Sequence, residues 1–222
     1  MSDTELFAQA KQELFTALVG DIMDKMGLFH QFLPQNLKPL DSKMVVIGRA
    51  MTVLEEDLPE ITPYERLEKP FGIMFEALDQ LRENEVYVCS GSSPTYALWG
   101  GLMSTRAIKL GASGAILNGM SRDTNEILRL NFPTFSLGTY AVDQGPRGRV
   151  VAYRTPIDFE GVTINPGDII FGDRDGVIVI PGESEKEVFD RAFEKARGEK
   201  LVLKELQNGM STVDAFEKYG IM

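Results

Sequence analysis

Apolar residues recur along the chain with two periods, one typical of helices and one typical of strands. Near the N-terminus, Leu6, Ala10, Leu14 and Leu18 follow helical spacing. This segment is therefore predicted to be helical and to end at Gly27, because glycine commonly follows the last turn of a helix.

The C-terminal segment is predicted to be helical as well. Ser184 and Glu187 have the spacing of a capping box, in which each side chain binds a backbone N–H of the first turn. Asn208-Gly209 is expected to end this helix. Ser211 with Asp214 predicts a second capping box and a final short helix.

The middle of the chain alternates between short β-branched segments and segments with helical spacing. Strands are predicted at 85–90, 113–119 and 133–138, with helices at 101–111 and 124–131. Strand, helix, strand, helix, strand at this spacing predicts a parallel βαβαβ unit.

Other segments surround this unit. Residues 44–54 are apolar and β-branched, which predicts a strand. The acidic stretch 55–70 contains three prolines and is predicted to form a loop or short turns, followed by a short amphipathic helix at 73–81. Short strands with Gly and Pro turns fill 148–181 and predict antiparallel sheet or barrel elements.

No internal repeat or linker divides the chain. We therefore predict a single α/β domain over residues 1–222, with N-terminal helices within 1–30 and C-terminal helices within 184–222. The apolar stripes of these terminal helices would suit packing between subunits, or they would cover the sheet of their own chain.

Charge and composition exclude several classes of protein. Lys and Arg number 23 and Asp and Glu 33, a net charge of −10. Such a chain repels nucleic-acid phosphates and anionic membranes. The longest uncharged run, Val86–Thr105, contains too many Ser and Gly residues for a membrane span. With Cys89 as the single cysteine, no internal disulfide forms, and a cytoplasmic protein is expected.

The uncharged stretch is the most informative part of the chain. Between Val86 and Ser121 only Arg106 and Lys109 are charged. Gly100-Gly101 precedes a predicted helix, where glycines let backbone N–H groups approach an anionic ligand. Alternatively, the glycine pair only permits a tight turn.

Charge returns at Arg122-Asp123, directly after a predicted parallel strand. Ligands of such sheets bind at the carboxyl ends of the strands, so the strand end at 90, with the helix start near Gly101 that follows it, and the strand end at 120 are expected to be neighbours. Arg122 could hold a carboxylate with two hydrogen bonds, and Asp123 could bind a hard divalent cation such as Mg²⁺. Glu126 would lie on the same side. The alternative is a surface Arg-Asp pair with Glu126 as an ordinary first-turn acid.

The run ALWGGLMSTRAIKLGASGAILNGMSRDTNEI resembles the RraA-like family, which includes the class II 4-hydroxy-4-methyl-2-oxoglutarate / 4-carboxy-4-hydroxy-2-oxoadipate aldolases. The pattern is a glycine, twenty residues, Arg-Asp, two residues, then Glu or Asp. Here it is formed by Gly101, Arg122-Asp123 and Glu126. The resemblance extends to TALVGDIMDKMG, GVTINPGDIIFGDRDGVIVIP and STVDAFEKYGIM, and so covers most of the chain.

The resemblance implies a fold and an assembly. It implies a βαβ-containing sandwich of the swivelling β/β/α type with N- and C-terminal helices. The expected assembly is a homotrimer or a homohexamer made of two trimers, with sites between subunits. An acidic residue would come from the C-terminal helix of the neighbouring subunit, for which Glu199 is the first candidate and Glu194 the second.

It also implies the contents of the site. Mg²⁺ or Mn²⁺ would be bound by Asp123, largely through waters, and a pyruvate-type 2-oxo acid would chelate the ion. Arg122 would face the oxygen that becomes the enolate, and Glu126 belongs to the same catalytic set. The substrate carboxylate would be held by the backbone amides of Gly101, Leu102 and Met103.

Two positions depart from the family pattern. Family members often have Asp before the glycine that precedes Arg-Asp, where this chain has Asn118-Gly119. They often have an acid in the loop after the first parallel strand, where this chain has Ser90-Gly91-Ser92-Ser93. Both changes remove negative charge near the expected site, so the substrate can differ.

The implied activity is that of a lyase, a metal-dependent pyruvate aldolase. Cleavage of a 4-hydroxy-2-oxo dicarboxylic acid leaves an enolate, which a metal and an arginine would stabilise. Oxaloacetate decarboxylation passes through the same enolate. A Schiff base would need a desolvated lysine, and Lys109 lies late in a helix. The alternative function is a protein-binding regulator of ribonuclease activity without catalysis, although the complete Arg122-Asp123-x-x-Glu126 pattern favours the enzyme.

The remaining candidates have structural explanations. His30, the single histidine, is expected in an exposed loop and cannot build a histidine zinc site alone. Trp99 is expected to anchor the core. Asp173 and Asp175 are expected in a turn between strands.

Overall fold

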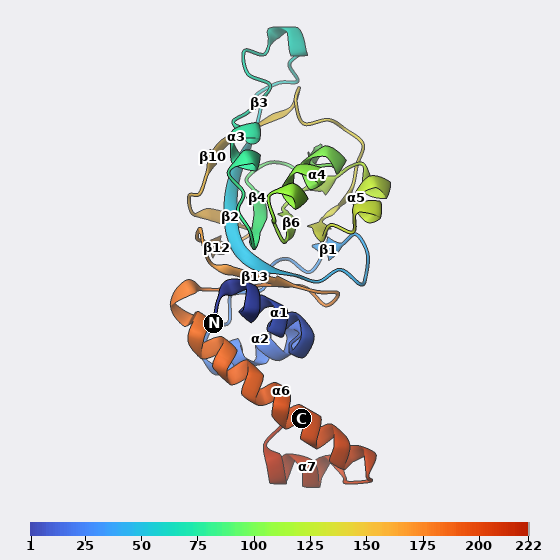
Figure 1. Cartoon of the computed structure of the whole chain (residues 1–222). Coiled ribbons are helices and arrows are strands. Elements are labelled where there is room, and N and C mark those ends of the chain that lie inside the picture. Colours follow the sequence, from blue (N-terminus) through green and yellow to red (C-terminus); the bar gives the residue numbers. More distant parts are fainter. Residues whose placement is uncertain (222) are drawn as a thin grey trace.

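The structure, a computed structural model, describes residues 1–221. Its centre is a nine-stranded sheet that curls around one group of helices (Figure 1). The strands are β1 (Lys38–Pro39), β2 (Val46–Asp57), β3 (Phe71–Gly72), β4 (Glu85–Ser90), β6 (Gly114–Leu117), β8 (Thr134–Ser136), β10 (Gly148–Tyr153), β13 (Ile169–Gly172) and β14 (Val177–Ile180). The order is β1-β8-β6-β4-β2-β10-β3, and β13 pairs with both β2 and β14.

The predicted βαβαβ unit is confirmed. Strands β2, β4, β6 and β8 are parallel neighbours. Helix α4 (Gly101–Lys109) connects β4 to β6, and α5 (Thr124–Leu130) connects β6 to β8. The other helices are α1 (Asp3–Glu13), α2 (Thr16–Lys25), α3 (Met74–Asp79), α6 (Glu185–Gln207) and α7 (Thr212–Tyr219), with 3-10 turns η1 (Tyr64–Arg66) and η2 (Gly182–Ser184). The α/β fold with terminal helices is therefore as expected.

A second, smaller sheet lies beyond the parallel strands. It consists of β5 (Ala97–Trp99), β7 (Met120–Ser121) and β9 (Gly138–Thr139), which pair in parallel. Each of its strands follows a parallel strand of the main sheet, since β5 comes after β4, β7 after β6 and β9 after β8. The carboxyl ends of three parallel strands are thus joined by a further hydrogen-bonded layer. A hairpin of β11 (Ile157–Phe159) and β12 (Val162–Ile164) completes the fold.

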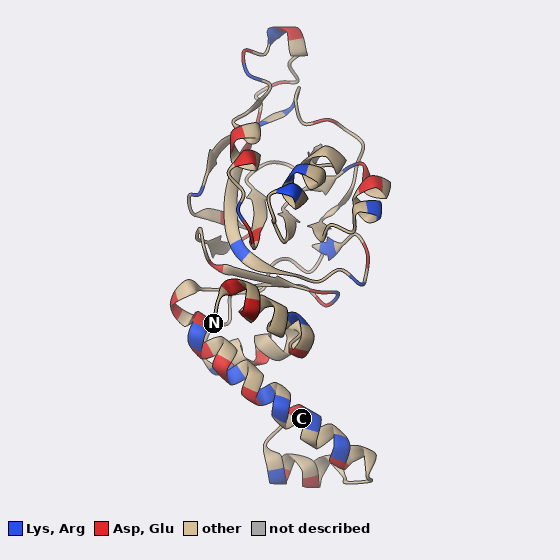
Figure 2. Cartoon of the chain, in the orientation of Figure 1, with Lys and Arg blue, Asp and Glu red and all other residues tan. Residues whose placement is uncertain are grey.

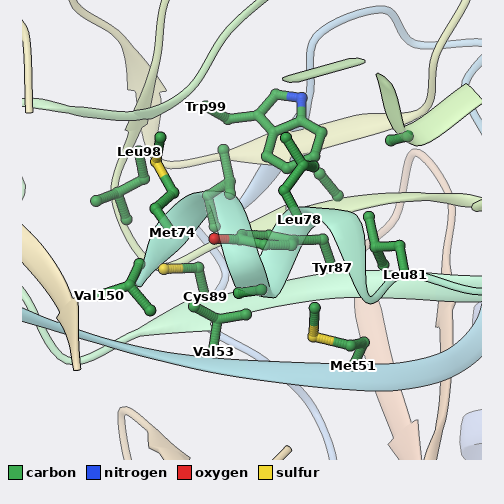
Figure 3. Packing of buried hydrophobic residues seen from close by; sticks show 14 of the residues in the cluster. Met51, Val53, Met74, Leu78, Leu81, Tyr87, Cys89, Leu98, Trp99 and Val150 are labelled. Atoms are coloured by element: carbon green, nitrogen blue, oxygen red, sulfur yellow. The ribbon is translucent and has the colours of Figure 1, made fainter. Parts of the chain in front are cut away.

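Both faces of the sheet are apolar. Successive side chains of a strand point to opposite sides of the sheet, and apolar residues occupy both sets of positions. On β4, Tyr87 and Cys89 face helices α3, α4 and α5, whereas Val86 and Val88 face the β11–β12 hairpin. Trp99 is 1% exposed and packs against the Tyr87 ring at 4.8 Å, with Leu78 of α3 beside it (Figure 3). Its expected role as a core anchor is confirmed.

The N-terminal helical pattern is interrupted in the structure. Leu14 and Phe15 are extended, and they separate α1 from α2 although the apolar stripe continues across them. The cause is a distant contact, because Asp173 accepts hydrogen bonds from the Thr16 backbone N–H at 2.8 Å and from its hydroxyl at 2.6 Å. Asp173 lies in the predicted turn between β13 and β14. Its carboxylate binds the first residue of α2, so the new helix begins at Thr16.

Two further expectations were wrong in detail. The acidic residues 55–57 belong to β2 instead of a loop, because β10 pairs with them from Gly148 to Val150. Ser184 forms no capping box, since it lies in a 3-10 turn with no side-chain cap. Of the second predicted capping box only one half forms, in which the Ser211 hydroxyl accepts from the Asp214 backbone N–H.

The terminal helices cover the sheet of their own chain in part. Apolar residues of α1, α2 and the first half of α6 pack against β13 and β14. The rest of α6 projects away from the sheet, and α7 folds back against α6 (Figure 1). Figure 2 shows charges of both signs along α6. No helix within residues 1–221 has the length and apolar character that crossing a membrane requires.

Candidate functional site

The site is built where β5 and β7 lie side by side. These strands pair in parallel, and the backbone N–H of Arg122 donates to the Trp99 carbonyl at 2.9 Å. The residues that follow each strand are therefore neighbours, namely Gly100-Gly101 at the start of α4 and Arg122-Asp123 at the start of α5. This juxtaposition is the one predicted from the strand ends.

The two glycines are required by this close approach. A Cβ atom on Gly100 would lie 2.6 Å from Asp123 Oδ2, and one on Gly101 would lie 2.8 Å from Glu126 Cγ. Neither residue has a positive φ, and Gly100 has an extended φ of −157°. The glycines thus accommodate these two side chains in addition to the turn, and a role of their backbone N–H groups in anion binding stays a prediction.

Asp123 has an unusual backbone conformation. Its φ and ψ of 56° and 35° are left-handed, which costs an Asp residue about 1 kcal/mol. It occupies the N-cap position of α5 without capping that helix. Its Oδ2 instead accepts from the Gly101 N–H of α4 at 3.1 Å. The strained backbone thus turns an exposed carboxylate toward the neighbouring helix terminus.

The first turn of α4 offers backbone donors beside this carboxylate. The Gly101 N–H is used by Asp123, which changes the expectation that it takes a substrate carboxylate. The Leu102 and Met103 N–H groups have no hydrogen-bond partner within residues 1–221, since the helical ladder starts at Ser104. Two free amides at a helix N-terminus favour an anion.

Arg122 is held by a residue that the sequence analysis did not single out. Its Nη1 lies 2.6 Å from Oδ1 of Asp143, and the other oxygen of Asp143 accepts from the Tyr64 hydroxyl. Burial and this hydrogen bond raise the pKa of Tyr64 to about 12. Asp143 follows the third parallel strand, so the rule that indicated Arg122 would also have indicated Asp143.

The acidic candidates lie in different places. Glu126 packs over Gly101 and pairs with Arg129. Glu199 and Glu194 are on α6, which lies on the other side of β13 from α4 and α5 (Figure 1). Glu199 lies 3.4 Å from Lys195 Nζ. A role for Glu199 or Glu194 in the site of a neighbouring subunit stays a prediction.

A cavity of about 230 Å³ opens beside Arg122 and Asp123. Asp143 and Gln144 complete its polar side. Behind Gln144 lies Glu55, which is fully buried and accepts from Gln144 Nε2 at 2.8 and 2.9 Å. Burial raises the pKa of Glu55 to about 8. A second cavity, of about 390 Å³, is also lined by Arg122 and Asp123 and includes Thr139 and Tyr140.

The donor set at Asp123 fits a hydrated hard cation. Within residues 1–221, no group of three or more His, Cys, Asp or Glu side chains could hold a metal alone. Asp123 is exposed, and its Oδ1 makes no hydrogen bond to any described residue. One carboxylate oxygen with open surroundings suits Mg²⁺, which keeps several waters. His30 is exposed, as expected.

Comparisons with known proteins identify the family of this chain. The model of the RraA-like family, Aldolase/RraA, matches residues 16–179. A Halalkalibacterium halodurans protein named "Putative 4-hydroxy-4-methyl-2-oxoglutarate aldolase" is 28% identical over 97% of this chain and 96% of its own. Protein DlpA of Legionella pneumophila is 29% identical over 92% of this chain, which spans only 32% of DlpA.

The fold is shared with a solved structure. Streptomyces coelicolor RraAS2, described as an unusual member of the RNase ES inhibitor RraA protein family, superposes with a TM-score of 0.76. The match covers 90% of this chain and 96% of that chain, and at 22% identity it shows likeness of fold alone. Because the family model covers most of the chain and includes the pattern from Gly101 to Glu126, the chain belongs to the RraA-like family.

Proposed function

We propose that this protein is a divalent-metal-dependent lyase that cleaves a 4-hydroxy-2-oxo dicarboxylic acid, such as 4-hydroxy-4-methyl-2-oxoglutarate, and releases pyruvate. One observation carries the proposal. A guanidinium, an exposed carboxylate and two free backbone amides converge from α4 and α5 on one small cavity. The aldolase name of a relative at 28% identity supports the same reaction class.

The chain's own groups divide the work of this reaction. The Leu102 and Met103 amides would bind the carboxylate next to the 2-oxo group. Arg122 would face the 2-oxo oxygen, where negative charge develops as the C3–C4 bond breaks. A water or an acidic side chain would take the C4 hydroxyl proton. Oxaloacetate decarboxylation generates the same enolate and would use the same groups.

Asp123 would hold the cation, Mg²⁺ or Mn²⁺, with waters and substrate as the remaining ligands. When bound, the ion supplies a positive charge that polarises the substrate carbonyl. The contact between Asp123 Oδ2 and the Gly101 N–H fixes the carboxylate while Oδ1 stays available.

Assembly would complete the site. The projecting end of α6 has exposed Leu201 and Leu203 beside Glu199. We propose a homotrimer or homohexamer in which Glu199 of one subunit, or Glu194, reaches the Arg122 cavity of another. A monomer with full activity would contradict this arrangement.

Removal of divalent metal is expected to abolish pyruvate release from 4-hydroxy-4-methyl-2-oxoglutarate and from oxaloacetate. Pyruvate is measured with a coupled assay before and after treatment with a chelator. Addition of excess Mg²⁺ to the treated protein serves as the control and should restore the rate. Equal rates with and without the chelator would rule out the metal-dependent reaction.

Asp143→Asn is expected to lower kcat/KM by about 10–100-fold, because loss of the partner that orients a functional group has effects of this size. Arg122 keeps its charge but loses the carboxylate that fixes Nη1. Asp175→Asn, in the exposed β13–β14 turn, is the matched control. If both variants have the same kcat/KM, Asp143 has no positioning role.

A second candidate function is regulation of a ribonuclease through protein contact. The likeness in fold to RraAS2, whose family is described as an RNase ES inhibitor, favours it. Arg122→Ala separates the two functions, because a contact surface elsewhere does not need this side chain. Inhibition of ribonuclease cleavage that persists in the variant, with no pyruvate release by the wild-type protein, would favour the regulator.

A further inference from the structure

The cavity beside Arg122 has two chemically different sides. Its polar side consists of Arg122, Asp123, Asp143 and Gln144. Its other side is apolar and comes from four elements, namely β3, α3, β5 and α4. The apolar side chains are Phe71, Met74, Phe75, Leu98, Leu102 and Met103.

Phe71 shows that this apolar wall is built with some strain. Its φ of 67° is left-handed, which is rare for a bulky residue. The ring is nevertheless held, because its centroid lies 5.5 Å from that of Phe75 in an edge-on arrangement and 6.2 Å from that of Tyr64. Tyr64 in turn donates to Asp143. The apolar wall and the polar side are therefore tied together.

The mouth of the cavity exposes apolar surface. Phe75 is 55% exposed and Leu102 is 88% exposed. Large apolar side chains that converge on a small cavity with a few polar groups are typical of ligand sites. A ligand that covers them would gain from burial of its own apolar part.

The charges around the cavity indicate what this apolar part is. Arg122 is the single cation that lines it within residues 1–221, and Asp143 already pairs with Arg122. The other charged residues of the cavity, Asp123 and Asp143, are acidic. The apolar wall therefore has no positive charge beside it that could pair with a carboxylate. An uncharged alkyl group fits this wall, whereas an anionic group would be desolvated there without a partner.

We infer that this wall is a subsite for an alkyl substituent on C4 of the substrate. The inference rests on the proposed function, in which Leu102, Met103 and Arg122 hold the pyruvyl end. The methyl group of 4-hydroxy-4-methyl-2-oxoglutarate is the smallest such substituent, and ethyl and propyl are larger ones. The structure thus points to branched 4-alkyl-4-hydroxy-2-oxo acids as the substrate class.

The chemistry balances for each member of the series. The C3–C4 bond breaks, the C4 hydroxyl proton goes to a base, and the electron pair of the bond goes to C3, which takes up a proton. One product is pyruvate. The other is the 2-oxo acid that carries the alkyl group, which is pyruvate itself from the methyl compound and 2-oxobutanoate from the ethyl compound.

Binding tests the subsite without turnover. The probes are 4-methyl-, 4-ethyl- and 4-propyl-2-oxoglutarate, which lack the C4 hydroxyl and cannot undergo retro-aldol cleavage. Calorimetric titration in the presence of Mg²⁺ is expected to show affinity rising about fourfold for each added methylene, the transfer value for a buried CH₂. Affinity that is constant or falls along the series would overturn the inference.

Two variants locate the effect. Phe75→Arg, at a half-exposed position on a helix surface, is expected to abolish the rise with chain length, and Phe75→Ser should do so without adding charge. Phe29→Arg adds the same charge at a residue that is 62% exposed and lies outside the cavity, and should keep the rise. A rise that survives in both Phe75 variants, with their helical content intact, would contradict the assignment.

The corresponding hydroxylated substrates separate the inference from the proposed function. If the proposed function and the subsite are both correct, pyruvate is released from the 4-methyl compound and kcat/KM is higher for the 4-ethyl compound. Rising affinity without any pyruvate release would contradict only the proposed function. Pyruvate release from the methyl compound with flat affinities would contradict only the subsite.

Discussion

Replacement of Arg122 by alanine is expected to lower kcat/KM for pyruvate release by about 10²–10³, the loss found when one charge-stabilising donor is removed. Arg122 is the single cation lining the cavity within the described residues, and Asp143 fixes its orientation. No other side chain there can replace its charge. Steady-state kinetics with 4-hydroxy-4-methyl-2-oxoglutarate and Mg²⁺ provides the measurement.

The effect should appear mainly in kcat, because the developing charge exists only in the transition state. Arg149→Ala removes an arginine that is 52% exposed and lies outside this cavity, so it serves as the matched control. Asp123→Ala should cause a similar loss. Full activity of both the Arg122 and Asp123 variants would place the site elsewhere.

Glu55→Gln is expected to change how stability depends on pH. Burial raises the pKa of Glu55 to about 8 from 4.5, so the folded protein binds this proton more tightly than the unfolded chain does. The stabilisation is complete below pH 4.5 and is lost as pH rises toward 8, by about 1.4 kcal/mol per pH unit within this window.

The glutamine variant cannot ionise, and its amide can still bond to Gln144. Its unfolding free energy should therefore lack this slope and exceed that of the wild-type protein near pH 8. Urea unfolding at several pH values between 5 and 8 provides the test. Glu56→Gln, at the neighbouring half-exposed position on β2, should keep the wild-type slope. Parallel curves for wild type and Glu55→Gln would contradict the prediction.

The central unit was predictable because its signals are local. The strands at 85–90, 113–119 and 133–138 alternate with helical spacing, and this order forces parallel pairing. The rule for strand ends then brings Gly100-Gly101 to Arg122-Asp123. The helix break at Leu14 was not predictable, because it depends on Asp173, a residue far along the chain.

The two missed residues differ in this respect. Asp143 could have been found with the strand-end rule, although its pairing with Arg122 is a tertiary contact. Glu55 lies in a segment that was predicted as a loop, and only tertiary contacts show what it does. Glu55 is buried because β10 extends its pairing to the end of β2. The apolar wall could not be foreseen either, since Phe71 and Phe75 belong to a segment that packs against α4 only in the folded chain.

The small β5-β7-β9 sheet has a consequence for how this protein can diversify. Its backbone hydrogen bonds hold the reacting groups, whereas the Tyr64–Phe75 segment supplies much of the alkyl wall from outside that sheet. Under the proposed function, mutations of the wall residues Phe71, Met74 and Phe75 would therefore alter which compounds are accepted while the chemical step is retained. Two descendants of one ancestor could share the Gly101-to-Glu126 pattern and still consume different metabolites.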